Sequence, residues 1–324
     1  MSLAEFALID RIRARTAERD DVVLGIGDDA ALLQPRPNEQ LVVTADTLNS
    51  GVHFPAETMP FDIGWKTLAV NLSDLAAMGA RPIGCVLGLA LPRLDEPWLA
   101  AFAEGFHALA AAHGCPLIGG DTTRSAHDLA ISVTVFGAVP AGQALRRDAA
   151  QAGDDIWVSG ELGAADVAYR LLDGQYPAND ALLAATRAAL EWPQPQVALG
   201  MALRGIAHAA VDLSDGLLQD LGHILAASRL GARLEVDRMP VAAAVAALDD
   251  APRRRAVLGG GDVYQLCFTA PAAQREAVQA AARAASAQVS RVGQTLAQPG
   301  LQVLDGQGRP LTDLPGGFDH FPSA

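Results

Sequence analysis

Aspartates stand repeatedly beside glycine, serine or threonine in this chain of 324 residues. A single aspartate in such a place is typical of a helix cap or a turn. Their recurrence favours a cleft of carboxylates, which would repel one another unless divalent cations lay between them. Mg²⁺ prefers oxygen ligands and bridges carboxylates to phosphates, so the pattern indicates Mg²⁺-dependent phosphoryl transfer. The candidates are Asp28 and Asp29 in GIGDDA, Asp46 in VVTADTL, Asp74 in NLSDLAAMG, Asp121 in IGGDTT, Asp212 and Asp215 in VDLSDG, and Asp262 in GGGDVY.

The stretch VVLGIGDDAALL, residues 22–33, also fits the G-x-G-x-x-G/A pattern that cradles a dinucleotide pyrophosphate. Asp46 follows about 20 residues on, where such a site places its ribose partner. A dinucleotide-binding unit needs a long crossover helix after the glycines. Pro35 and Pro37 interrupt the segment that would form this helix. The sequence therefore predicts no Rossmann unit.

Residues 30–34 and 40–46 are instead predicted to form the two strands of a hairpin. Asp28 and Asp29 occupy positions where backbone amides would meet a pyrophosphate, and carboxylates there repel phosphate unless a divalent cation intervenes. We therefore interpret Asp29 as a metal ligand and Asp28 as a residue that shapes the loop.

Lysine occurs once, as Lys66 in IGWKTLAV. A P-loop requires a Gly-Lys pair followed by Ser or Thr, and the chain contains no Gly-Lys pair. The lysine, H-R-D and D-F-G set of protein kinases is also absent. The phosphoryl-transfer chemistry must therefore use another fold.

Strands and helices alternate in both halves of the chain, which predicts an α/β (α+β) protein of two domains. The polar connector PAGQALRRDAAQAGD separates them, so we expect an N-terminal domain over 1–148 and a C-terminal domain over 149–324. Apolar residues at helical spacing predict a helix over 61–78. Asn71 and Asp74 are three residues apart on this helix and share a face.

The net charge of −13 disfavours nucleic acids and anionic membranes as partners. No apolar run approaches the roughly 20 residues that span a bilayer, and the N-terminal segment has no signal-peptide core, so we expect a cytoplasmic protein. Cys85, Cys115 and Cys267 are far apart, which favours buried, reduced thiols.

A longer set of motifs, in order over essentially the whole chain, resembles the thiamine-monophosphate kinase family. This family belongs to the superfamily of aminoimidazole ribonucleotide synthetase and selenophosphate synthetase, which use ATP without a P-loop. The resemblance implies an N-terminal α/β domain that forms a homodimer, a C-terminal α/β domain, and ATP in the cleft. The motifs are EFALIDRI, GIGDDAALL, TADTLNSGVHF, KTLAVNLSDLAAMGARP, LIGGDTTRS, ALRRDAAQAGDDIWVSGELG, AVDLSDGLLQDLGHI, GGGDVYQLCF and GFDHF.

The resemblance also implies roles for the matching residues. Several Mg²⁺ ions around the ATP triphosphate would be held by Asp29, Thr44, Asp46, Asp74, Asp121, Asp212 and Asp215. ATP would be contacted by Gly120, Arg147 and Ser214. Thiamine monophosphate would be bound by His53, Asp262 and Phe318. Catalysis would rest on Asp46, Asp121 and Arg147.

Four positions depart from the family pattern. Ala45 stands where the family usually has Ser or Thr, so this residue offers a metal only its carbonyl. The family usually reads Gly-Gly-Glu-Asp-Tyr-Glu-Leu where this chain reads GGDVYQL. Glutamate is thereby replaced by the shorter Asp262, and two further acids by Val263 and Gln265.

The implied reaction is ATP-dependent phosphorylation of thiamine monophosphate to thiamine diphosphate by direct in-line transfer. The attacking phosphate oxygen is already ionised near pH 7, so positioning and charge neutralisation suffice without a general base. One alternative is another ATP-using member of the superfamily. Selenophosphate synthetase, for example, is expected to have a Cys and a Lys near the N-terminus, and none precede Lys66 and Cys85. The other alternative is a non-catalytic protein that binds nucleotide and metal.

Overall fold

The computed structural model describes residues 19–26 and 30–319, so the predicted metal ligand Asp29 lies outside the described residues. The chain divides into two compact units. Unit 1 comprises the described residues up to Leu75 together with Ala80–Gly142, and unit 2 comprises Ala76–Gly79 and the residues from Gln143 onward. Both units mix helices and strands, which confirms the predicted α/β (α+β) class.

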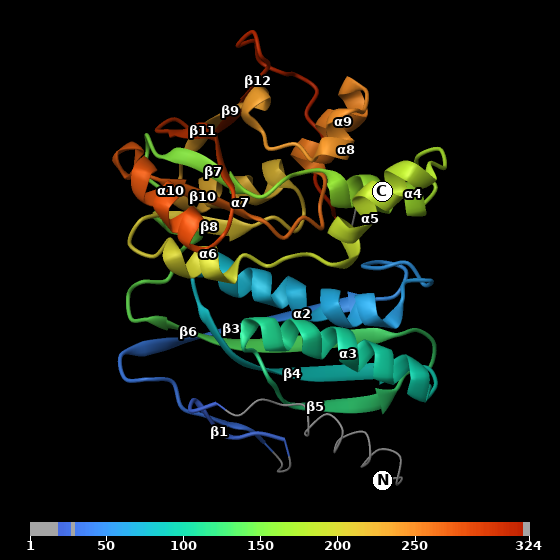
Figure 1. Cartoon of the computed structure of the whole chain (residues 1–324). Coiled ribbons are helices and arrows are strands. Elements are labelled where there is room, and N and C mark those ends of the chain that lie inside the picture. The colour runs from blue at the N-terminus through green and yellow to red at the C-terminus, as the bar shows by residue number, and fades with distance from the viewer. Residues whose placement is uncertain (1–18, 27–29, 320–324) are drawn as a thin grey trace. The chain divides into compact units, whose positions relative to one another are not determined.

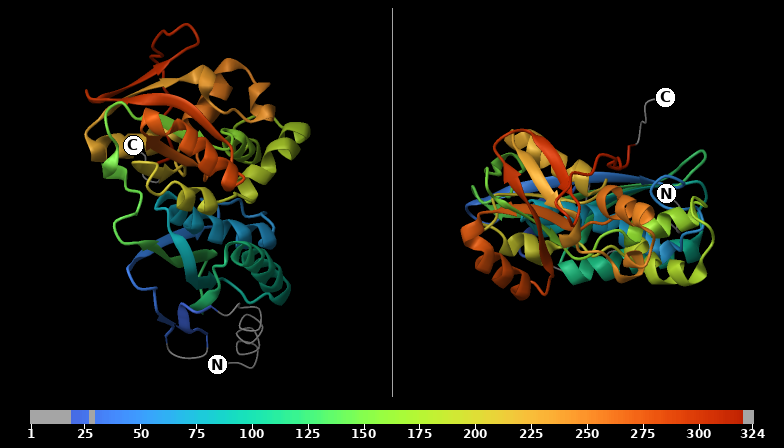
Figure 2. Two further views of the ribbon diagram at one scale, coloured as in Figure 1. Left: turned by 60° about the vertical axis from the view of Figure 1, so that its left-hand side comes forward. Right: turned by 90° about the horizontal axis from the view of Figure 1, so that it is seen from above.

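Unit 1 is built on a four-stranded sheet in the order β3-β6-β4-β5. Strand β6 is antiparallel to both of its neighbours, and β4 and β5 are parallel. Helices α2 and α3 lie side by side on one face of this sheet (Figures 1 and 2). The elements are β1 (Val22–Leu24), β2 (Leu32–Leu33), β3 (Glu39–Asn49), α2 (Pro60–Ala77), β4 (Arg81–Leu91), α3 (Glu96–His113), β5 (Leu117–Arg124) and β6 (Ala130–Pro140).

The predicted hairpin over 30–34 and 40–46 is wrong. Strand β2 pairs with β1 in a separate two-stranded sheet, whereas β3 pairs along its whole length with β6. The local hairpin does not form because β3 pairs with β6 over its whole length. This longer antiparallel pairing makes more ladder hydrogen bonds than the short hairpin could. The described part of residues 27–41 contains no helix, in agreement with the prediction that no Rossmann unit is present.

Two glycines allow α2 and α3 to approach each other closely. A Cβ atom added to Gly105 in α3 would lie 1.9 Å from the carbonyl oxygen of Phe61, and one added to Gly64 in α2 would lie 2.1 Å from that of Phe102. Helix α2 is therefore held against α3 through backbone contact that no larger residue permits.

Unit 2 is built on a six-stranded sheet in the order β12-β9-β11-β7-β10-β8, in which only the β12–β9 pair is parallel. Its elements are η1 (Arg147–Ala149), β7 (Asp155–Ser159), α4 (Ala164–Leu172), α5 (Asp180–Glu191), α6 (Val197–Ala202), β8 (Ala209–Asp212), α7 (Leu217–Ser228), β9 (Gly231–Glu235), η2 (Val236–Arg238), α8 (Ala243–Ala246), α9 (Asp250–Gly259), β10 (Leu266–Ala270), η3 (Ala272–Gln274), α10 (Arg275–Ala284), β11 (Val289–Leu296) and β12 (Gly300–Leu304).

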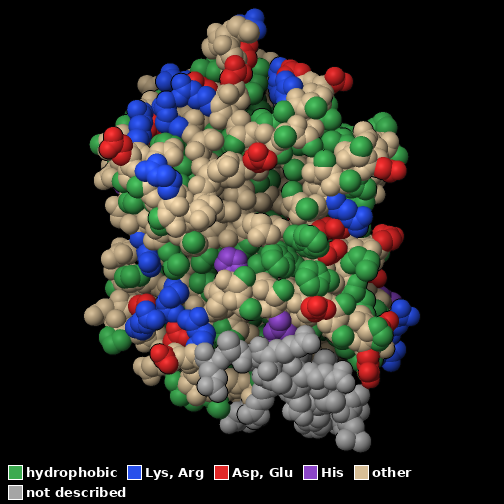
Figure 3. All heavy atoms as spheres, viewed as in Figure 1, with side chains coloured by type: hydrophobic (Ala, Val, Ile, Leu, Met, Phe, Trp, Pro, Cys, Tyr) green, Lys and Arg blue, Asp and Glu red, His purple; other side chains and the backbone are tan. Residues whose placement is uncertain are grey.

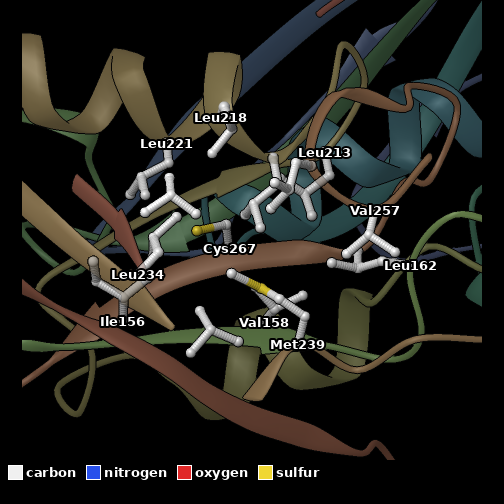
Figure 4. Close-up of a cluster of buried hydrophobic side chains, with 14 of the residues drawn as sticks. Ile156, Val158, Leu162, Leu213, Leu218, Leu221, Leu234, Met239, Val257 and Cys267 are labelled. Carbon is white, nitrogen blue, oxygen red and sulfur yellow. The ribbon is translucent and has the colours of Figure 1, made fainter. Parts of the chain in front are cut away.

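The core of unit 2 forms between this sheet and α7. Figure 4 shows Leu218 and Leu221 of α7 together with Ile156 and Val158 of β7 and the thiol of Cys267 of β10. The apolar residues of α7 recur at helical spacing, so they line one face that the sheet buries. The end of β8, where Asp212 lies, and the start of α7 are consequently fixed by the core, and the loop between them carries Asp215.

Surface charge and the cysteines are further features of the described residues. No helix in the described residues is long and apolar enough to cross a membrane. On the surface drawn in Figure 3, basic side chains gather toward the upper left and the lower left, with acidic side chains beside them. Cys85, Cys115 and Cys267 are buried and free, as predicted.

We predict that Gly105→Ala destabilises the protein, because the new methyl group would overlap the Phe61 carbonyl. Overpacking of this kind lowers the free energy of unfolding by about 1–3 kcal/mol. Urea denaturation followed by circular dichroism measures the change.

Gly222→Ala is the matched control, because no atom lies within 4 Å of the place where its Cβ would stand in α7. Alanine should raise the free energy of unfolding there by about 0.5–1 kcal/mol, its advantage over glycine inside a helix. Equal effects of the two substitutions would contradict the proposed close contact between α2 and α3.

Candidate active site

Strand β3 and helix α2 bring together three of the predicted metal ligands. Thr44 and Asp46 alternate with Ala45 along β3, so their side chains point to the same side. The Thr44 hydroxyl donates a hydrogen bond to Asp74 of α2, and the Asp46 N–H donates to Asn71 Oδ1 at 3.1 Å. Asn71 and Asp74 thus share the helix face that the sequence predicts, and this face meets β3.

The negative charges and oxygen atoms of Thr44, Asp46 and Asp74 are suited to binding a hard cation. Burial, and after it the negative charge of Asp74, raise the pKa of Asp46 to about 6. Two carboxylates and a hydroxyl are oxygen donors of the kind that Mg²⁺ prefers. The residues present therefore suit Mg²⁺, which would relieve the repulsion that raises this pKa. Within the described residues, no three His, Cys, Asp or Glu side chains gather into a metal site.

Asp121 lies apart from this group within one chain. It is an exposed residue of β5, which forms one edge of the sheet, whereas β3 forms the other. The register runs from Asp46 through Val133 and Leu87 to Gly120, the residue before Asp121. Three strand spacings correspond to about 14 Å along the sheet.

Gly120 is required by packing between β4 and β5. A Cβ atom at this position would stand 2.2 Å from the carbonyl oxygen of Leu87. The glycine therefore allows β5 to follow β4 closely and presents Asp121 on the exposed end of the strand.

His53 lies in the loop that follows β3. Its Nδ1 accepts a hydrogen bond from the Asn49 N–H at 3.0 Å, and its carbonyl accepts one from Lys66 Nζ at 3.0 Å. Because Nδ1 is an acceptor, the neutral ring carries its proton on Nε2. The Nε2–H group of the ring is therefore a hydrogen-bond donor of the kind that binds a phosphate oxygen.

In unit 2, three loops that carry predicted site residues are joined through their backbones. The Asp262 N–H donates to the Ser214 carbonyl at 2.8 Å, and the Phe318 N–H donates to the Asp215 carbonyl at 2.9 Å. Gln219 of α7 donates to the carbonyl of Phe318 at 3.0 Å. The predicted ATP contact Ser214 and the predicted substrate contacts Asp262 and Phe318 are thus brought together.

Asp212 and Arg147 border the same loops. Asp212 is the last residue of β8 and is only 5% exposed. Arg147 is exposed, its carbonyl accepts a hydrogen bond from the Ser228 hydroxyl at 2.8 Å, and its charge acts on Asp220 in α7. The neighbouring Arg146 pairs with Asp148 at 2.6 Å.

Asp220 is a buried acid that sequence reasoning missed. Its Oδ2 accepts the N–H groups of Asp215 at 3.1 Å and Gly216 at 3.0 Å, so it shapes the turn that precedes α7. Burial, and then the charge of Asp215, raise its pKa to about 7. The signal for this role was an acid in the first turn of a helix whose N-cap residue is Gly216.

The departures from the family pattern have separate structural explanations. Asp262 has φ of 59° and Tyr264 has φ of 51°, and the Tyr264 hydroxyl donates to Asp262 Oδ1 at 3.1 Å. Aspartate tolerates a left-handed backbone better than most residues. Val263 packs against the apolar core, and Gln265 Oε1 accepts a hydrogen bond from the Ser159 hydroxyl at 2.7 Å. Positions 263 and 265 therefore contribute to the structure of unit 2.

Comparisons with known proteins agree with this architecture. Residues 27–139 match the AIR synthase related protein N-terminal domain, and residues 143–306 match the C-terminal domain of the same family. Thiamine-monophosphate kinase from Salmonella typhimurium is 42% identical, over 99% of both chains.

Two solved structures extend this similarity. The structure of thiamine-monophosphate kinase from Stenotrophomonas maltophilia is 58% identical with a TM-score of 0.86, over 96% of this chain and 99% of that one. The structure of AaThiL complexed with AMPPCP and TMP is 28% identical with a TM-score of 0.76, over 99% of both chains. The chain described here therefore belongs to the thiamine-monophosphate kinase family of AIR synthase related proteins.

Proposed function

We propose that this protein is an enzyme that uses ATP to phosphorylate thiamine monophosphate, giving thiamine diphosphate for its biosynthetic supply. The observation that carries this proposal is the match, over 99% of both chains, to a structure that binds AMPPCP and TMP together. The relatives named thiamine-monophosphate kinase, which cover nearly the whole chain, support the same reaction.

The chain's own residues suit the joining of two anions. The attacking phosphate oxygen is ionised near pH 7, so the enzyme must orient it and neutralise charge, without abstracting a proton. His53 would donate from Nε2 to the substrate phosphate, and Arg147 would bind the transferred phosphoryl group. Ser214 and Gly120 would contact ATP, while Asp262 and Phe318 would hold the thiamine portion.

Several Mg²⁺ ions would be held by the oxygen donors of both units. Unit 1 would supply Thr44, Asp46, Asp74 and Asp121, and unit 2 would supply Asp212 and Asp215; Asp29 is proposed from the sequence alone. Bound Mg²⁺ supplies positive charge that stabilises the phosphates of both reactants.

We also propose that the protein acts as a cytoplasmic homodimer. Asp46 and Asp121 lie on opposite edge strands of one sheet, so one copy does not bring them into contact. The edge strand β3 exposes Leu41 and Val43 by 46% and 54%, as expected of a surface that another chain covers. A second copy that set its β5 beside this β3 would bring the partner's Asp121 toward Asp46.

The central test is incubation of the protein with ATP, Mg²⁺ and thiamine monophosphate. We predict formation of thiamine diphosphate, and we predict that Asp46→Asn or Asp121→Asn lowers kcat at least about 100-fold, because each removes a charge that the bound metal requires. Chromatographic analysis of the product measures the rate, and circular dichroism checks that each variant is folded.

Glu104→Gln, which changes an exposed acid of α3, is the control and should keep the wild-type rate. Wild-type turnover by either aspartate variant would refute the metal assignment. If the wild-type protein binds ATP but forms no product, the non-catalytic alternative replaces the kinase.

The pH dependence of stability should report on Asp46. Its folded pKa of about 6 lies above the value of about 3.9 expected in an unfolded chain. The stabilisation from its neutral form is therefore complete below about pH 4 and is lost as the pH rises through about 6. In differential scanning fluorimetry, Mg²⁺ should raise the Tm clearly at pH 7.5 and only weakly at pH 5, where protons compete with the metal.

Asp46→Asn isolates this contribution, because Asp220 titrates in an overlapping range. The variant should have a smaller loss of Tm between pH 4 and pH 7 in the absence of metal, and a smaller response to Mg²⁺. An unchanged pH profile would show that Asp46 is not the titrating group.

We predict that Tyr264→Phe weakens substrate binding, because it removes the hydrogen bond that fixes the short Asp262 side chain. The loss of one such bond corresponds to a rise in KM for thiamine monophosphate of about two- to tenfold. Steady-state kinetics should show an unchanged KM for ATP.

Tyr176→Phe is a matched control, since the buried Tyr176 hydroxyl has no hydrogen-bond partner in the part of the chain that the structure describes. This variant should keep both KM values. An equal rise of the two KM values in Tyr264→Phe would argue for a general disturbance of unit 2 instead.

A further inference from the structure

The single lysine of the chain has no part in the reaction proposed above, although its side chain is buried. Lys66 lies in α2 and is 3% exposed. An ammonium group is rarely buried unless hydrogen bonds or opposite charges compensate for the water it has lost. Asp62, which is 7% exposed, precedes it by one helical turn on the same face. The position therefore places an amino group that requires hydrogen-bond partners in the interior of unit 1.

The lysine side chain reaches the loop that carries His53. Lys66 Nζ donates to the His53 carbonyl at 3.0 Å, so the helix is tied to the backbone of this residue. A hydrogen bond from a charged donor is roughly twice as strong as one between neutral groups.

The loop itself is closed by hydrogen bonds within a few residues. The His53 N–H donates to the Asn49 carbonyl at 3.0 Å, while the Asn49 N–H donates to the His53 ring. The Gly51 N–H donates to the carbonyl of Phe54, whose side chain is only 4% exposed. Because the loop is compact, a contact that fixes the His53 carbonyl also fixes the direction of its ring.

We propose that Lys66 is a positioning residue for the binding of thiamine monophosphate. It holds the His53 loop on the helix that also contacts the metal-ligand strand β3 through Asn71 and Asp74. The ring N–H of His53, which would bind the substrate phosphate, and the oxygen ligands of Thr44 and Asp46 are thus all held in position by helix α2. This inference rests on the proposed kinase function and adds a residue that sets the distance between substrate phosphate and metal.

Kinetics of Lys66→Met and Lys66→Arg test the proposal. Lys66→Met should raise KM for thiamine monophosphate about tenfold, the effect of losing about 1.4 kcal/mol of binding. The KM for ATP should stay within a factor of two, and Lys66→Arg should recover part of the loss because it restores a donor.

Arg93→Met is the control, because it removes the same charge from unit 1 at a side chain that is 83% exposed. It should leave both KM values unchanged. The proposal is overturned if Lys66→Met changes the two KM values equally, or if it leaves the KM for thiamine monophosphate at the wild-type value.

A measurement on the unaltered chain covers the case in which Lys66→Met does not fold. Protein labelled with ¹³Cε-lysine gives one lysine signal, since Lys66 is the only lysine. This signal should shift when thiamine monophosphate is added and stay in place when a non-hydrolysable ATP analogue is added. A response to the nucleotide alone, or to neither compound, overturns the positioning role. Product formation by the wild type decides the kinase function separately, because the signal reports binding even when no product appears.

Discussion

The hydrogen bonds that the polar side chains of α2 make to β3 and to the loop after it are the constraint on which the candidate site of unit 1 depends. Asn71 has no exposed surface, and its Oδ1 accepts a backbone N–H of the edge strand β3 in place of a neighbouring strand. Asp74 accepts a hydrogen bond from Thr44, and Lys66, which projects from another side of the helix, donates to the carbonyl of His53. Buried polar groups must keep their hydrogen bonds, so these contacts leave β3 and its loop little freedom relative to the helix. The positions of the candidate ligands therefore follow from the register of one helix.

Unit 2 achieves the same rigidity through glycine. A Cβ atom at Gly261 would lie 2.5 Å from the Ser214 carbonyl oxygen, and one at Gly317 would lie 2.6 Å from that of Asp215. The loops after β8, after α9 and near residue 317 can approach so closely only where no side chain intervenes. Gly261 and Gly317 thus have a structural task, which is to bring the loops of Ser214, Asp262 and Phe318 together.

The sequence predicted these features where the periodicity was local and failed where the pairing was distant. Helical spacing correctly placed Asn71 and Asp74 on one face, and the prolines correctly predicted that no crossover helix forms in the described residues 30–41. The partner of β3 was missed because strand pairing over about 90 residues leaves no local pattern. The same limit hid the separation of Asp46 from Asp121, since residue spacing does not give the order of strands in a sheet. Asp220 was overlooked although it is an acid in the first turn of a helix, because its partners are backbone amides and therefore leave no complementary side chain in the sequence.

The distribution of charge is consistent with a reaction between two anions. The chain has a net charge of −13, yet its one lysine is buried beside the loop of His53. Cations bound by carboxylates would supply positive charge only while metal is present, whereas the hydrogen bond from Lys66 to the His53 carbonyl does not depend on metal. The site must also align the attacking phosphate oxygen. This alignment needs hydrogen-bond donors in fixed positions, because a mobile ion neutralises charge without orienting the oxygen. In α2, the proposed metal ligand Asp74 and Lys66, which holds the loop of His53, belong to one helix, so the proposed ligand and the proposed phosphate donor have a common support.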